Sequence, residues 1–113
     1  MAESRKVLNR NVMIDLIGDD RESIRQFEID FLKQAKISLI KIASLYNEKN
    51  LAAVKEEAHF LKTSAKAVGA EQAADFLEAL EHAALENNKE KSKQKILQIK
   101  ESLLLVHKEV KNG

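Results

Sequence analysis

The sequence contains no cysteine, no proline and no tryptophan, and it has only three glycines among its 113 residues. Without cysteine the chain has no disulfide, iron–sulfur cluster or thiolate zinc site. Proline and glycine are the residues that most often interrupt helices, whereas the abundant Ala, Leu, Ile, Glu and Lys are compatible with helix. The composition therefore predicts an all-α protein, and the length fits a single domain over residues 1–113.

A strong excess of either charge is also missing, because 19 basic and 18 acidic residues leave a formal net charge of +1. Binding to nucleic acid or to a membrane surface favours a marked positive excess, so neither partner is expected. Aromatic residues make up only 4% of the chain, which is unfavourable for stacking on bases. No apolar run approaches the ~18 residues of a membrane helix, and no apolar signal segment follows the N-terminus. We therefore expect a soluble, cytoplasmic protein.

Apolar residues recur every three or four positions along most of the chain, which is the spacing of amphipathic helices. The pattern predicts a short helix around residues 12–17 and long helices over about 20–46, 51–68, 71–86 and 96–110. Residues 1–10 are expected to be flexible, and residues 89–95 to be a charged, solvated stretch. Four long helices with short links predict an antiparallel up-down-up-down bundle, with the short N-terminal helix covering one end.

Local signals place the helix ends and the buried faces. Gly18 and Gly69 are expected to end the helices before them, and Asp19 to cap the second helix. In that second helix the apolar arc includes Phe27, and it is widened by Ile29, Leu32, Ile37 and Ile40. Tyr46 is expected to end the core with its hydroxyl in water. The third helix has one continuous apolar stripe, formed by Leu51, Val54, Ala58, Leu61, Ala65 and Val68.

His59 lies off that stripe, about 130° from its centre at 100° per residue, so it should face water or a partner. Lys55, Lys62, Thr63 and Lys66 follow the helical spacing onto the same side. The segment thus presents an imidazole on a basic ridge with an apolar back. Phe60 lies about 100° further round, where packing on the second helix is slightly favoured over a place in a docking patch.

Other common chemistries are missing from the sequence. It has no glycine-rich phosphate loop and no G-x-S-x-G nucleophile elbow. The three histidines, His59, His82 and His107, lie in separate helices, and none has the spacing of paired metal ligands. No cofactor or metal is therefore expected on this chain. A neutral imidazole can attack a phosphoryl group near neutral pH if positive charge lies close by, which Lys62 could supply. The alternative is that His59 is an ordinary histidine on a solvated face.

Residues Ala58–Ala70, AHFLKTSAKAVGA, closely resemble the signature of histidine-containing phosphotransfer (HPt) domains, which is roughly A-H-x-L-K-G-S-[SA]-x-x-[LIV]-G-A. Leu80-Glu81 also falls where that family often has Leu-Glu, and Phe31-Leu32 falls where an aromatic–leucine pair is common. The resemblance extends over about residues 12–111. It implies a helical bundle without kinase activity, in agreement with the missing nucleotide motif.

The resemblance also implies roles for individual residues. His59 corresponds to the phosphoacceptor and Lys62 to the lysine that steadies the phosphoryl group. Thr63 departs from the family, which usually has glycine there, and its added bulk could narrow access or its hydroxyl could contact phosphate. Lys55, Thr63, Lys66 and Ala67 are the expected docking residues around the histidine.

The implied function is a phosphoryl shuttle between aspartates of response-regulator receiver domains, with a hybrid histidine kinase as a further possible partner. The receiver, not this chain, would supply Mg²⁺. We expect a free-standing monomer. Two alternatives remain open: a helical adaptor that docks a receiver or kinase without accepting phosphate, which Thr63 alone favours, and a small-molecule or metal-binding bundle, which the lack of convergent polar core residues disfavours.

Overall fold

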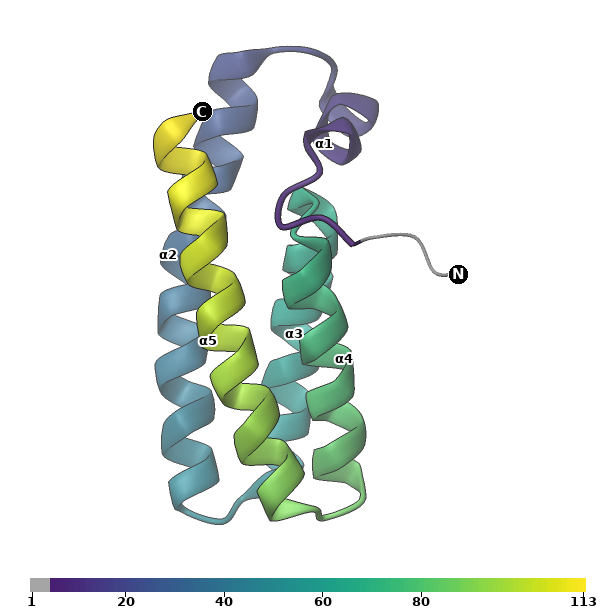
Figure 1. Cartoon of the computed structure of the whole chain (residues 1–113), viewed down its shortest axis with the longest axis vertical. Helices are drawn as coiled ribbons and strands as arrows, with labels where there is room; N and C mark the ends of the chain where they lie inside the picture. The colour runs from purple at the N-terminus through teal and green to yellow at the C-terminus, as the bar shows by residue number, and fades with distance from the viewer. Residues whose placement is uncertain (1–4) are drawn as a thin grey trace.

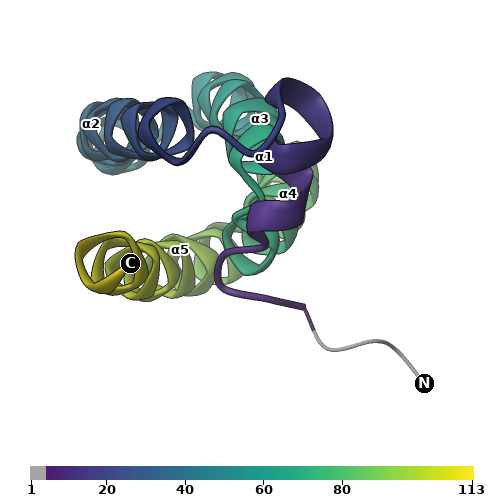
Figure 2. The same cartoon turned by 90° about the horizontal axis from the view of Figure 1, so that it is seen from above.

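The computed structural model describes residues 5–113, and these residues form five α-helices (Figure 1). The helices are α1 (Arg10–Ile17), α2 (Arg21–Asn47), α3 (Leu51–Val68), α4 (Glu71–Leu85) and α5 (Lys89–Asn112). The four long helices run alternately up and down, and α1 lies across one end of the bundle (Figure 1, Figure 2). The predicted all-α bundle with a short covering helix is confirmed.

The core is formed by the helical stripes that the sequence predicts. All six stripe residues of α3 are buried, and α4 and α5 bury one side each in the same way. Many of these side chains are alanines, which let two helices approach closely. The core residues of α4 and α5 are Ala73, Ala74, Leu77, Leu80, Ala83, Ala84, Ile99, Leu103, Val106 and Val110.

The apolar arc of α2 is narrower than predicted. Phe27 is 50% exposed, and Ile37 and Ile40 are each 62% exposed, so the prediction that they join the core is wrong. The main neighbours of α2 are α3 and α5, with a smaller contact to α1, and side chains outside the arc that faces these helices stay exposed. The Tyr46 hydroxyl also differs from the prediction, because it donates a hydrogen bond to the Lys89 carbonyl at 3.1 Å.

Asparagine or aspartate side chains cap four of the five helices at their N-termini. Asp20, rather than the predicted Asp19, accepts a hydrogen bond from the Ser23 backbone N–H. The side chains of Asn9, Asn50 and Asn88 cap α1, α3 and α5. The cap at Asn88 also corrects the start of the last helix. Residues 89–95 are helical rather than irregular, because a polar first turn with a good cap does not need an apolar stripe.

The three links between the long helices share one backbone design. Each link contains one residue at positive φ, namely Lys49 (64°), Gly69 (86°) or Asn87 (58°). In each link the next N–H bonds back to a carbonyl five residues earlier, as in the Schellman motif: Asn50 to Leu45, Ala70 to Ala65 and Asn88 to Ala83. The residue that donates this bond is also the N-cap of the next helix. Consecutive helices are therefore forced into tight antiparallel pairs.

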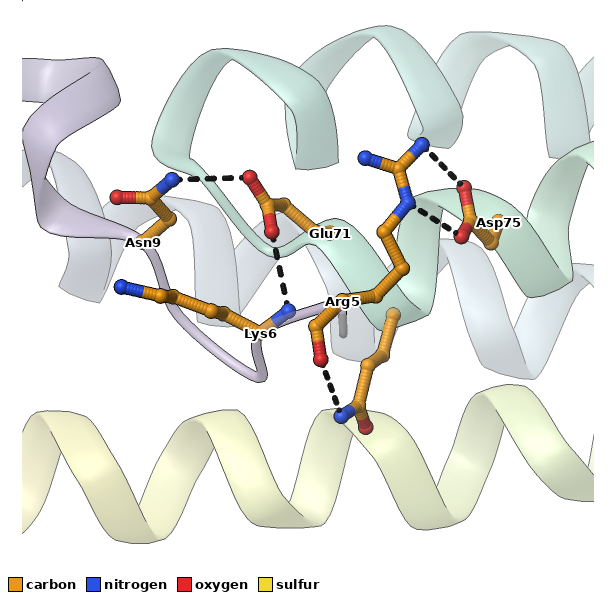
Figure 3. A network of polar contacts seen from close by, with 6 residues as sticks. Arg5, Lys6, Asn9, Glu71 and Asp75 are labelled. Atoms are coloured by element: carbon orange, nitrogen blue, oxygen red, sulfur yellow. Dashed lines mark hydrogen bonds and ion pairs between the residues drawn. The ribbon is translucent and has the colours of Figure 1, made fainter. Parts of the chain in front are cut away.

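The segment before α1 is bound to α4 (Figure 3). Arg5 pairs with Asp75 at 2.9 Å, the Lys6 backbone N–H donates to Glu71 at 3.0 Å, and the Asn9 amide donates to the same carboxylate at 2.9 Å. Of the 1–10 segment that was expected to be flexible, residues 5–9 thus contact α4, whereas residues 1–4 lie outside the described part.

Gly69 is required where this segment crosses the α3–α4 link. The Asn9 N–H bonds to the Gly69 carbonyl at 2.7 Å, which brings the two backbones together. A Cβ on residue 69 would collide with the Asn9 carbonyl, and the positive φ of 86° is itself unfavourable for a side chain. Gly69 and Ala70, which close the Ala58–Ala70 segment, thus both end α3 and allow the N-terminal segment to pack closely on the link.

The positive φ of Lys49 provides a test of this link design. Replacing Lys49 with glycine should raise the free energy of unfolding by about 0.5–1 kcal/mol, because a left-handed conformation penalises a Cβ. Urea unfolding followed by circular dichroism measures the change. Asn87→Gly is the matched control, since asparagine tolerates this conformation, and its effect should stay within about 0.5 kcal/mol. Equal effects of the two substitutions would contradict the explanation.

Candidate functional site

His59 projects from the middle of α3 with 65% of its side chain exposed. Its Nδ1 atom lies 3.0 Å from Oε1 of Glu81, which comes from the neighbouring helix α4. Glu81 is itself mostly covered, with 12% of its side chain exposed. The imidazole is therefore exposed to solvent, but one of its nitrogens is held by a largely buried carboxylate.

This contact decides which nitrogen of His59 is nucleophilic. An ionised carboxylate only accepts hydrogen bonds, so Nδ1 must carry the proton that lies between it and Glu81. In the neutral ring the lone pair is then on Nε2. Within residues 5–113, Nε2 has no hydrogen-bond partner. The arrangement leaves one nucleophilic nitrogen on a largely exposed ring.

Lys62 lies one turn from His59, but it is not the solvated side chain that the basic ridge implied. Its side chain is only 14% exposed, and its Nζ atom lies 2.8 Å from Oε2 of Glu81 and 3.7 Å from Oε1 of Glu78. The hydrogen bond to Glu81 raises the pKa of Lys62 above its ordinary value, against the opposite effect of burial. Lys62 is thus a cation held at the α3–α4 seam.

Glu81 joins the two α3 side chains to α4. Burial raises the pKa of its carboxyl, but hydrogen bonds from Lys62 and His59 lower it by more, and the pKa of Glu81 ends below its ordinary value. Glu81 is therefore ionised at neutral pH and bridges His59 through one oxygen and Lys62 through the other. A carboxylate so placed fixes the orientation of the imidazole and the position of the ammonium group together.

The predicted docking residues lie around the histidine on α3. Thr63, Lys66 and Ala67 are exposed, and Lys55 is partly covered. The Thr63 hydroxyl donates a hydrogen bond to the His59 carbonyl at 3.2 Å, one turn back along the helix. This bond occupies the hydroxyl proton, which the sequence left free to contact a phosphate.

Two features of this surface were not predicted. Glu81 was noted only as part of a Leu-Glu pair, and nothing in its spacing showed that it would reach two residues of another helix. The signal available was Glu78 and Glu81 on one side of α4, opposite His59 and Lys62 on α3. Phe60 is 50% exposed, so half of its side chain adds apolar surface next to His59.

The other histidines do not join the site. His82 and His107 are exposed on α4 and α5, as expected for surface residues. Among residues 5–113, no group of three or more histidine, aspartate or glutamate side chains is placed to hold a metal ion. No helix in this part of the chain is long and apolar enough to cross a membrane.

Comparison with known proteins gives the family. The model of the Hpt domain family matches residues 17–111, and the chain therefore belongs to that family. The crystal structure of histidine-containing phosphotransfer protein B (HptB) from Pseudomonas aeruginosa PAO1 has the same fold, with a TM-score of 0.87 and 18% sequence identity. The alignment covers 96% of this chain and 95% of that one. No curated protein matches the sequence significantly.

The Glu81 bridge should make part of the stability depend on pH. The pKa of Glu81 lies below its ordinary value of 4.5 in the folded protein, so the folded state binds fewer protons than the unfolded state in this range. The stabilisation is complete above pH 4.5 and is lost as the pH falls through the folded pKa. Urea unfolding of wild type and Glu81→Gln at a series of pH values should show their difference shrinking in acid.

Glu78→Gln is the matched control for this measurement. Glu78 is 54% exposed and lies 3.7 Å from the same ammonium group, so its removal should change stability little at any pH. A wild-type advantage over Glu81→Gln that is the same in acid and at neutral pH would mean that the bridge does not stabilise the fold through its charge.

Proposed function

We propose that this chain carries a phosphoryl group on His59 between receiver-domain aspartates in a two-component phosphorelay. The observation that supports this most is the His59–Glu81 contact of 3.0 Å, on the exposed face of a bundle that belongs to the Hpt domain family. It leaves Nε2 as a nucleophile with a lone pair, on a ring whose orientation is fixed.

The transfer step follows from this geometry. The Nε2 lone pair forms the new P–N bond, the P–O bond to the receiver aspartate breaks, and the aspartate leaves as a carboxylate with the bonding electrons. The ring becomes positively charged and keeps its proton on Nδ1, where Glu81 lies 3.0 Å away and stabilises that charge. In the return direction a receiver aspartate attacks phosphorus, and His59 leaves as a neutral imidazole.

Nearby cations would act on the phosphoryl oxygens. Lys62 stands one turn from His59 and would interact with them while it remains paired with Glu81. Lys55 and Lys66 add positive charge around the site and, with Thr63 and Ala67, form the surface on which a receiver would dock. The exposed ring of Phe60 extends this surface with an apolar contact.

The chain would act as a cytoplasmic monomer and a phosphocarrier without kinase activity of its own. Its partners would be response-regulator receiver domains, a hybrid histidine kinase or both. Mg²⁺ would be held by the receiver and not by this chain. No role with nucleic acid or membrane is proposed.

Phosphoryl transfer from a labelled receiver domain tests the site. Wild type should acquire an acid-labile, base-stable label, and His59→Gln should acquire none. Lys62→Ala should slow the transfer while circular dichroism shows the helical content retained. His82→Gln is the matched control, because that histidine is exposed on α4 and, although it follows Glu81 in the chain, the partners of the Glu81 carboxylate are His59 and Lys62. Its labelling should equal wild type.

Two outcomes would contradict the proposal. Equal labelling of wild type and His59→Gln would place the phosphoryl group on another residue. A receiver that binds wild type without labelling it would instead support a docking adaptor that does not accept phosphate.

Thr63 gives a separate prediction about access to the site. Because its hydroxyl is bonded to the His59 carbonyl, its bulk should matter more than its polarity, and Thr63→Gly should transfer faster than wild type. Glycine within a helix costs about 1 kcal/mol of stability, so transfer is measured well below the unfolding temperature. Thr63→Val keeps the shape and removes the hydroxyl, and its rate should match wild type. If Thr63→Val and Thr63→Gly transfer at the same rate, and that rate differs from wild type, the hydroxyl rather than the bulk controls transfer.

A further inference from the structure

The seam between α2 and α5 contains an apolar groove. Two adjoining cavities of about 400 and 390 Å³ open there, and they share Leu32, Lys36 and His107. The seam lies on the side of the bundle away from α3 and α4, the helices that carry His59 and Glu81 (Figure 2). Apolar residues of both helices line the groove: Ile29, Leu32, Ala35, Leu39, Leu103, Leu104 and Val110.

All charged side chains that line this groove are basic. They are Arg25, Lys33, Lys36, Lys100 and Lys111, and His107 adds a titratable group, whereas no carboxylate lines either cavity. The chain as a whole has 19 basic and 18 acidic residues and is nearly neutral. The absence of acidic residues from the groove lining is therefore a local concentration of positive charge. The four lysines form no ion pair or hydrogen bond within residues 5–113. The rim is therefore positively charged and lacks counter-charges of its own.

The dimensions of the groove match a short helix. Its lining runs from Lys100 to Lys111 on α5, which is about 17 Å or three helical turns. A helix that binds a groove of this length places apolar side chains three and four residues apart on the floor. Its flanking side chains would then meet the lysines at the rim.

We propose that the α2–α5 groove binds an amphipathic helix of a partner protein, with an apolar stripe flanked by acidic residues. The apolar floor accommodates the stripe, and the unpaired lysines complement the acidic flanks. A second copy of this chain does not fit, because a symmetric dimer through this face would place each basic rim against the other.

This surface has a function distinct from phosphotransfer. A partner bound between α2 and α5 leaves the α3–α4 seam uncovered, so His59 would stay accessible to a receiver. A receiver joined to the bound helix would be held on the same molecule as His59, which would raise its effective concentration at the histidine. The inference does not depend on phosphorylation of His59, and it is tested without phosphate.

The test uses a fluorescein-labelled 18-residue peptide with leucines at alternating spacings of three and four and glutamates on both flanks. A second peptide has lysine at every glutamate position. The acidic peptide should bind wild type and shift the backbone amide resonances of Leu32, Leu39 and Leu104, and the lysine peptide should not. Lys100→Glu should weaken binding by about threefold or more, because it turns attraction at the rim into repulsion.

Matched variants separate the groove from general surface effects. Lys91→Glu changes the net charge equally on the same helix outside the groove and should leave the affinity unchanged. Leu104, which is 56% exposed, lines the groove, whereas Leu85 is 69% exposed on α4. Leu104→Ala should therefore weaken binding and Leu85→Ala should not.

Three results would overturn the proposal. Equal affinity for the acidic and lysine peptides would remove the electrostatic argument. Amide shifts confined to the surroundings of His59 would place the binding elsewhere. Phosphatidylglycerol vesicles that shift the groove resonances while the acidic peptide does not would assign the surface to anionic lipid.

Discussion

The packing of α3 on α4 is the constraint on which the candidate site depends. Both helices bury alanines, such as Ala58 and Ala65 on α3 and Ala73 and Ala84 on α4. Their small side chains allow the two backbones to approach, and a glutamate on α4 can then reach across to α3. Larger residues at these positions would push the helices apart and remove Glu81 from both His59 and Lys62.

The Glu81 carboxylate then organises the chemistry. A carboxylate with 12% of its side chain exposed is costly unless it is paired, and here each oxygen has its own partner. The same contacts that offset this cost orient the imidazole and place the ammonium group. Stability and nucleophilicity are therefore coupled through one side chain, and a histidine on an ordinary solvated face would have neither the fixed ring nor the defined tautomer.

The sequence predicts the helices and their stripes because burial repeats locally along each helix. The α3 stripe and the left-handed end at Gly69 are the clearest examples. It does not predict contacts between helices, so Glu81 was missed, and Lys62 was expected to be more exposed than it is. Periodicity also cannot show how wide a face its neighbours cover, which is why Ile37 and Ile40 were placed in the core. The start of α5 was missed because its first turns are polar, although Asn88 caps them well.

The links between the helices also affect how the bundle would form. Three of its seams, α2–α3, α3–α4 and α4–α5, join helices that are consecutive in the chain and are separated by a tight turn. Among the four seams between the long helices, only α2–α5 joins helices that are not consecutive in the chain, so its closure carries the largest loop-closure entropy of the four. The groove lies at that seam, where no short link holds the two helices together. A helix bound in the groove would therefore stabilise the contact between α5 and α2, which is the helix contact that the chain connectivity favours least.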